Sequence, residues 1–179
     1  MKINIGAGST QYDGFVNCDY SNLFNPEYVF DLEKDTWPFE DNSVDEVYAH
    51  HVLEHLGEGY FHCLQELYRV CKADAIIDII VPHYRNENQF HDPTHRRFIT
   101  VIGLILFDQE FNRSGPPASS KLGLQFGVNF KTIRFHHSLN PEHHHFNELQ
   151  QQPDKQIALY AFDKVNVYEE THIVMRVVK

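Results

Sequence analysis

The pattern of apolar and polar positions predicts short strands and one amphipathic helix within the first 82 residues. Apolar runs at positions 3–5, 15–18, 44–49 and 75–81 have the length and composition of strands. Residues 59–72 carry apolar side chains at helical spacing, namely Tyr60, Phe61, Leu64, Leu67, Tyr68 and Cys71. The nearly continuous run from Ala75 to Val81, ended by Pro82, is typical of a parallel strand covered on both faces.

Alternation of strands and helices predicts an α/β fold with a parallel sheet and right-handed crossovers. Ligands bind such sheets at the carboxyl ends of the strands. Only residues 9–14 separate the first two predicted strands, and that length leaves no room for a full crossover helix. Toward the end of the chain, a helix-like stretch from Gln156 to Phe162 leads to a final strand over residues 172–178.

Length and composition predict one globular domain spanning residues 1–179. No apolar run approaches the roughly 18 residues of a membrane span, and no signal-peptide pattern follows Met1, so we expect a cytoplasmic protein without a membrane partner. The three cysteines, an odd number in strand-like or helix-like positions, are expected to be reduced and packed. Nothing in the pattern predicts an oligomeric state.

The net charge of −10 is concentrated in one half of the chain. Residues 1–82 hold 15 acidic and 4 basic side chains, whereas residues 83–179 hold 10 and 11. Five of the seven arginines lie between positions 85 and 134, where they could meet an anionic group of a substrate or could equally form a solvated face. No basic stripe suited to a nucleic acid is present, so nucleic acid is disfavoured as a partner.

A glycine-rich turn after the first strand is the strongest chemical signal. Gly6, Ala7 and Gly8 follow the run 3–5, and glycine allows a backbone turn to approach a ligand closely. Asp19 ends the second strand, where its carboxylate can accept hydrogen bonds from ribose hydroxyls. The short path between Gly8 and Asp19 favours a nucleoside ligand without a pyrophosphate, such as S-adenosylmethionine, over a dinucleotide.

Six ordered blocks resemble class I S-adenosylmethionine-dependent methyltransferases, in particular a small bacterial and phage group. The blocks are Asn4–Gly8, Asp19, Asp31–Leu32, Trp37–Val47, His51–His55 and Glu66–Val70. The resemblance covers residues 1–82 well, and residues 92–98 also look like that group. It implies a Rossmann-like, doubly wound, mostly parallel sheet with an antiparallel last strand and a reduced first crossover helix.

The same resemblance implies which residues hold S-adenosylmethionine. Gly6, Ala7 and Gly8 would lie under its methionine part, with Asn4 in the strand before them. Asp19 would bind the ribose, Asp31 and Leu32 would border the adenine, and His50 and His51 would line the sulfonium side. For the acidic residues the alternative role is a turn or capping carboxylate, and for the two histidines it is a structural hydrogen bond.

Residues 83–150 are expected to form the substrate side, followed by a final helix and strand over residues 151–179. Methyl transfer mainly requires alignment of the nucleophile with the methyl carbon, and a base is needed only for a protonated acceptor. His95, His91 and His83 are the candidate bases, because imidazole titrates near neutral pH. The expected activity is methylation of a small-molecule or saccharide-like acceptor.

Two other functions remain open from the sequence. The chain could be a module that binds S-adenosylmethionine without catalysis, because Asn4 replaces the acidic residue that many relatives have. His51, Glu54 and His55 also fit a His-x-x-Glu-His motif, which on a helix could bind zinc for hydrolysis. We favour the methyltransferase, which explains the motif without a metal.

Overall fold

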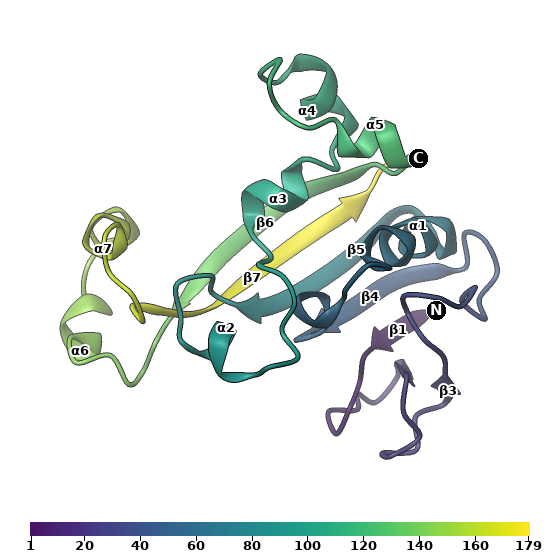
Figure 1. The fold of residues 1–179 in the computed structure, drawn as a ribbon, viewed down its shortest axis with the longest axis horizontal. Coiled ribbons are helices and arrows are strands. Elements are labelled where there is room, and N and C mark those ends of the chain that lie inside the picture. Colours follow the sequence, from purple (N-terminus) through teal and green to yellow (C-terminus); the bar gives the residue numbers. More distant parts are fainter.

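Seven strands form one mixed sheet in the order β3-β2-β1-β4-β5-β7-β6 (Figure 1). In this computed structural model, which describes residues 1–179, the strands are β1 (Lys2–Ile5), β2 (Val16–Asp19), β3 (Tyr28–Val29), β4 (Val44–His50), β5 (Cys71–Pro82), β6 (Phe130–Leu139) and β7 (Tyr168–Val177). Strands β1 to β5 pair in parallel, and β7 pairs antiparallel with both β5 and β6. The predicted mostly parallel sheet with an antiparallel last strand is confirmed.

The longest helix, α1 (Tyr60–Val70), connects β4 to β5 and confirms the helix predicted over residues 59–72. No helix lies between β1 and β2, so the reduced first crossover is confirmed as well. The remaining helical segments are the 3-10 turn η1 (Leu53–His55), α2 (Asn88–His91), α3 (Val101–Ile105), α4 (Gln109–Ser114), α5 (Leu122–Phe126), α6 (Phe146–Leu149) and α7 (Asp154–Ala161). None of these helices has the length and apolar character needed to cross a membrane.

Strand β6 was not predicted, and its position in the sheet explains why. It is an edge strand that pairs only with β7, and a register shift between Thr132 and Arg134 interrupts its side-chain alternation. Arg134, Phe135 and His136 are exposed, so the strand lacks the buried stripe that marks a half-covered strand in sequence.

The main core lies between one face of the sheet and the helices α1, α3 and α5. Val47, Ile77 and Ile173, on neighbouring strands, are fully buried within a cluster of 31 residues. The rings of Phe61 in α1 and Phe126 in α5 stack with centroids 4.1 Å apart. All three cysteines are free and buried in the core, as expected.

A charged pair connects α1 to the loop before β4. The Glu66 carboxylate accepts hydrogen bonds from the Trp37 backbone N–H (2.7 Å) and from the Arg69 guanidinium (2.7 Å). Arg69 also donates to the backbone carbonyls of Trp37 (3.0 Å) and Phe39 (2.9 Å). Two of the blocks that resemble the methyltransferase group, around Trp37 and Glu66, are therefore held together by these contacts.

Replacing Arg69 by Ala is expected to lower the free energy of unfolding by about 3 kcal/mol, because Glu66 would remain buried without its partner. Replacing Lys72 by Ala removes only an exposed ion pair with Asp45 and should cost less than about 1 kcal/mol. Urea denaturation of both variants checks this. Equal losses would show that Arg69 does not anchor the loop.

Candidate active site

The chain order reverses between β1 and β4, and the crevice at such a switch point is where ligands bind in doubly wound sheets. Gly6 leaves β1 in the left-handed region with φ of 61°. A Cβ atom at this position would lie 2.5 Å from a methyl carbon of Val52, which follows β4. Both the backbone conformation and the close packing therefore require glycine at position 6.

Asp19 fixes the loop that follows Gly6. One carboxylate oxygen accepts a hydrogen bond from the Gly8 backbone N–H (2.8 Å). The other oxygen accepts one from the Ser21 backbone N–H (2.9 Å). Because the side chain remains partly exposed, each oxygen can accept a further hydrogen bond from a ligand.

A cavity of about 370 Å³ opens over this turn. Its lining includes three of the residues predicted to contact a cofactor, Gly6, Asp19 and His51, together with seven that were not predicted to do so: Tyr20, Glu33, Val52, His55, Leu56, Thr94 and Arg96. The lining comes from the end of β2 and from the segments that follow β1, β2, β3 and β4, together with residues 94–96.

Asn4 and Ala7 lie beneath the turn rather than in the cavity. Both are buried, and the Asn4 side-chain amide donates hydrogen bonds to the carbonyl of Thr10 (2.9 Å) and to the Asn17 side chain (3.0 Å). Asn4 therefore shapes the loop over residues 7–12 from below.

Asp31 and Leu32 directly precede a residue that lines the cavity, Glu33, but do not line it themselves. Asp31 accepts a hydrogen bond from the Glu33 backbone N–H (2.9 Å) and pairs with Lys34, which lowers the pKa of Asp31 below its ordinary value. Glu33 lines the cavity, and its carboxylate accepts hydrogen bonds from the backbone N–H groups of Gly57 and Gly59. No local pattern in the sequence distinguished Glu33, because its partners are 24 and 26 residues away.

His50 and His51 point to different places, because His50 ends β4 whereas the backbone turns into the left-handed region at His51. His50 lies away from the cavity, and its ring contacts the Tyr12 hydroxyl (3.3 Å) and Asp78 (3.0 Å). His172 binds the same Asp78 oxygen at 2.6 Å. Burial raises the pKa of Asp78, but these two histidines outweigh it and the pKa falls below its ordinary value. The structure therefore places His50 in a hydrogen-bond network outside the predicted pocket.

His51 has a strained backbone and two acidic neighbours. Its φ of 54° is in the left-handed region, which is uncommon for residues other than glycine and often marks functional sites. Its ring lies 3.0 Å from Glu170 and 3.5 Å from Glu54, and these two carboxylates raise the pKa of His51 to about 9. His51 is therefore an imidazolium at neutral pH.

A second cavity of about 290 Å³ adjoins the first, and the two share His51 and His55. It is lined entirely by polar residues and one proline: His51, His55, Pro82, Asn88, Asp92, His95, Glu169 and Glu170. Glu170 reaches this place because β7 runs antiparallel to β5 and pairs Glu170 with Pro82. The two glutamates were not predicted, because the final strand begins at Tyr168 rather than at residue 172.

The arginines do not form the anion site suggested as one possibility by their clustering. Arg85 and Arg97 donate to backbone carbonyls, of Phe162 and of Leu56 respectively. Only Arg96 lines one of the two adjoining cavities, and it lines the first. The second cavity is instead acidic.

Of the three candidate bases, only His95 lines the second cavity. His91 is exposed at the end of α2 and lines neither cavity. His83 is buried beside Tyr168 and His137, and its Nδ1 accepts a hydrogen bond from the Arg85 backbone N–H (3.2 Å). His83 therefore contributes to packing and hydrogen bonding inside the fold and lines neither cavity.

The His-x-x-Glu-His motif is not on a helix. Residues 53–55 form a single 3-10 turn, and the left-handed His51 precedes it. The helix that would place His51 and His55 one turn apart on the same face is therefore absent, and the zinc hydrolase loses its geometric basis.

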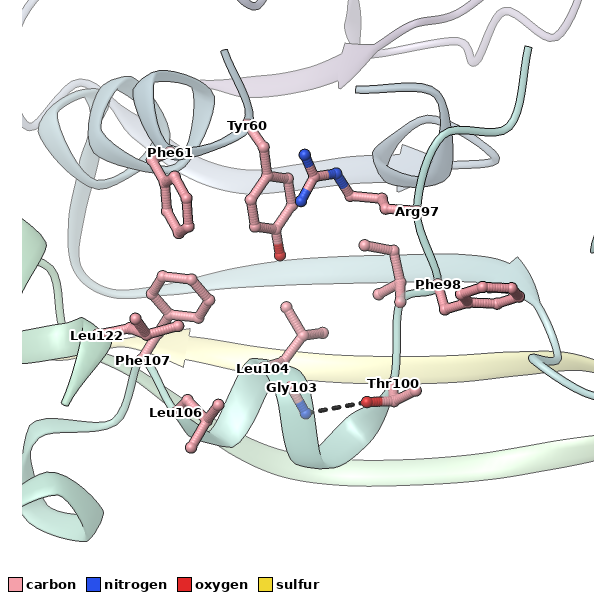
Figure 2. Close-up of a pocket in the computed structure, with 11 residues that line it drawn as sticks. Tyr60, Phe61, Arg97, Phe98, Thr100, Gly103, Leu104, Leu106, Phe107 and Leu122 are labelled. Carbon is pink, nitrogen blue, oxygen red and sulfur yellow. Dashed lines mark hydrogen bonds between the residues drawn. The ribbon is translucent and has the colours of Figure 1, made fainter. Parts of the chain in front are cut away.

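A third cavity, of about 190 Å³, lies between α1 and the segment from Arg97 to Phe107 (Figure 2). Figure 2 shows the Arg97 guanidinium against the Tyr60 ring, 4.1 Å from its centroid, and Thr100 accepting a hydrogen bond from the Gly103 N–H (3.0 Å). Most of its lining is apolar, so we interpret it as a gap in helix packing rather than a place for chemistry.

Residues 13–79 match the model of a family described as a methyltransferase domain. Among solved structures, an S-adenosylmethionine-dependent methyltransferase from Archaeoglobus fulgidus is similar, with a TM-score of 0.64 and 16% identity over 98% of this chain and 85% of that one. The YcgJ protein from Bacillus subtilis has a TM-score of 0.57 and 13% identity, over 99% and 91%. The [4+2]-cyclase SpnF has a TM-score of 0.59 and 12% identity, over 99% and 74%. No curated protein matches.

The buried His83 predicts a pH dependence of stability. Burial, with the nearby charges of His137 and Arg85, lowers the pKa of His83 to about 4, whereas an unfolded histidine titrates near 6.5. Below pH 6.5 the unfolded chain therefore binds a proton that the folded chain does not, and stability falls as pH drops toward 4.

In His83→Asn, the side-chain oxygen can replace Nδ1 as acceptor, and the titrating group is gone. Between pH 7 and pH 5 the wild type should lose about 2 kcal/mol more unfolding free energy than this variant. Urea denaturation at both pH values measures the difference, and parallel profiles would contradict the assignment.

Proposed function

We propose that this chain transfers a methyl group from S-adenosylmethionine to a small polyhydroxylated, saccharide-like acceptor, because residues 13–79 match a methyltransferase domain and the fold is similar to that of an S-adenosylmethionine-dependent methyltransferase. The observation that carries the proposal is the pair of adjoining cavities. One opens over the glycine turn and Asp19, the other is polar and acidic, and His51 and His55 form the wall between them.

The first cavity suits the nucleoside part of the donor. Its volume of about 370 Å³ falls in the range of small-molecule sites. Asp19 has acceptor capacity left for ribose hydroxyls, and the turn at Gly6 allows close approach of the backbone. Asp31 and Leu32, which directly precede the lining residue Glu33, would border the adenine. When bound, S-adenosylmethionine supplies the electrophilic methyl group.

The second cavity supports the choice of acceptor. Asp92, Glu169 and Glu170 offer carboxylate oxygens that accept hydrogen bonds from hydroxyl groups, and no arginine lines the cavity to attract an anion. A phosphorylated or carboxylated acceptor would face like charges there. Of the candidate bases, His95 alone can reach an acceptor held in this cavity.

The protein's main contribution to such a reaction is alignment. Holding the acceptor oxygen next to the methyl group converts a bimolecular encounter into an intramolecular step, which can supply about 7–11 kcal/mol of the barrier. Because His51 and His55 line both cavities, their positions set the spacing between donor and acceptor.

Replacing Asp19 by Asn should weaken S-adenosylhomocysteine binding by about ten- to a hundredfold, because hydrogen bonds to a charged group are worth about 1.5–3 kcal/mol. Asp13→Asn, which changes an exposed carboxylate outside the cavity, should leave the affinity unchanged. Isothermal titration calorimetry measures both. A wild-type protein that binds neither S-adenosylmethionine nor S-adenosylhomocysteine would refute the proposed function.

Transfer itself is tested by incubating the protein with S-adenosylmethionine and a panel of saccharides and small polyols, and by mass spectrometry of the products. A gain of 14 Da on a neutral hydroxylated acceptor is the expected result, since a methyl group replaces a hydrogen. Cofactor binding without transfer to any acceptor class would favour a binding module instead.

A further inference from the structure

Glu54, His55 and His95 bring three potential metal ligands together. One carboxylate oxygen of Glu54 and one ring nitrogen from each histidine lie within 4.8 Å of one another. The rings of His55 and His95 contact edge to face, with centroids 4.6 Å apart. Glu54 and His55 belong to the turn after β4, whereas His95 comes from the loop before α3.

The Glu54 carboxylate is buried and has unused acceptor capacity. The residue is fully buried, and neither of its side-chain oxygens has a hydrogen-bond partner. Its nearest charged neighbour is His51, at 3.5 Å from one oxygen. This ion pair is long and leaves the other oxygen without any partner, whereas buried carboxylates are normally hydrogen-bonded, closely paired or bound to a metal.

Both histidines are oriented so that one nitrogen keeps its lone pair. His95 Nδ1 lies 3.1 Å from the Gln89 carbonyl, which can only accept, so Nδ1 carries the proton and Nε2 is bare. His55 Nδ1 lies 2.8 Å from the Thr94 hydroxyl, which donates to Asp92 (2.6 Å) and therefore accepts from His55. Metal-binding histidines are typically fixed in this way by an acceptor on the other nitrogen.

We propose that Glu54, His55 and His95 bind one divalent transition-metal ion at the wall of the second cavity. Two imidazoles and one carboxylate are the protein ligands of one class of catalytic zinc site, which keeps a further position open. Zinc binds nitrogen at about 2.0–2.1 Å, so donors within 4.8 Å of one another need to move inward by at most about 0.7 Å each. The ligand set differs from the sequence motif, because His95 takes the place of His51.

The location gives the ion a use that rests on the proposed function. His55 and His95 line the second cavity, so an open coordination position there is accessible to an acceptor oxygen. A metal-bound hydroxyl loses its proton more readily than a free one. In this arrangement His95 serves as a ligand, and a carboxylate of the same cavity, Glu169 or Asp92, would accept the proton and pass it to solvent.

The test uses the full chain, without an affinity tag, after chelator treatment and removal of the chelator. Calorimetric titration with Zn²⁺ should show one tight equivalent, that is, tight binding of one Zn²⁺ ion per chain. Co²⁺ should produce the visible absorption bands of a coordinated ion. His95→Asn removes Nε2 but keeps a donor for the Gln89 carbonyl, and Glu54→Gln keeps the size of the side chain. Each should weaken Zn²⁺ binding by about tenfold or more.

Two control variants separate this site from other histidines. His91→Asn changes an exposed histidine outside the cluster and should leave the tight equivalent unchanged. His145→Asn interrupts the run His143–His145, which is a competing place for added zinc, and should also leave it unchanged. Thermal melting of every variant reports whether it is folded, and His95→Asn, at a partly exposed position, serves if Glu54→Gln unfolds.

Absence of a tight equivalent in the wild type would overturn the inference, as would a loss confined to His145→Asn. Wild-type affinity in both Glu54→Gln and His95→Asn would overturn it too. Calorimetry with S-adenosylhomocysteine on the same metal-free sample keeps the two proposals apart. Nucleoside binding without metal binding removes only the metal site, and the reverse result removes only the proposed function.

Discussion

The left-handed turn at Gly6, packed against Val52, is the constraint on which the site depends. It ends β1 where the strand order reverses and leaves no space for a Cβ atom, so the backbone stays close to the segment that follows β4. Asp19 then holds the next part of the turn through the Gly8 N–H. These contacts place the end of β2 and the turn after β4 around one cavity. Glu54 and His55 follow shortly after Val52 in that turn, so the packing of Val52 on Gly6 also positions them.

Local signals in the sequence were enough for the fold and for the floor of the first cavity. The glycine pattern and the stripe of α1 are visible in the sequence because each is carried by residues close together in the chain, and Gly6 and Asp19 line the same cavity. Strand β6 escaped prediction because it is an exposed edge strand with an interrupted register. Glu170 escaped because only the antiparallel pairing of β7 with β5, far apart in the chain, brings it to the site.

The histidines show how far residue type alone can mislead. His50 and His51 are neighbours, yet the strand end at His50 directs one side chain to Asp78 and the left-handed backbone of His51 directs the other to the wall between the cavities. His83 is buried in a structural position, while His95 reaches the acceptor side. Burial and hydrogen-bond partners, neither of which composition reveals, decide which imidazoles are available for chemistry.

A crystal structure of the protein with S-adenosylhomocysteine tests the central claim most directly. The claim predicts that the ribose hydroxyls hydrogen-bond to Asp19, that the ligand fills the cavity over Gly6, and that its sulfur points toward His51 and the acidic second cavity. A ligand bound elsewhere, such as between α1 and the segment from Arg97 to Phe107, or a sulfur directed away from the second cavity, would contradict it.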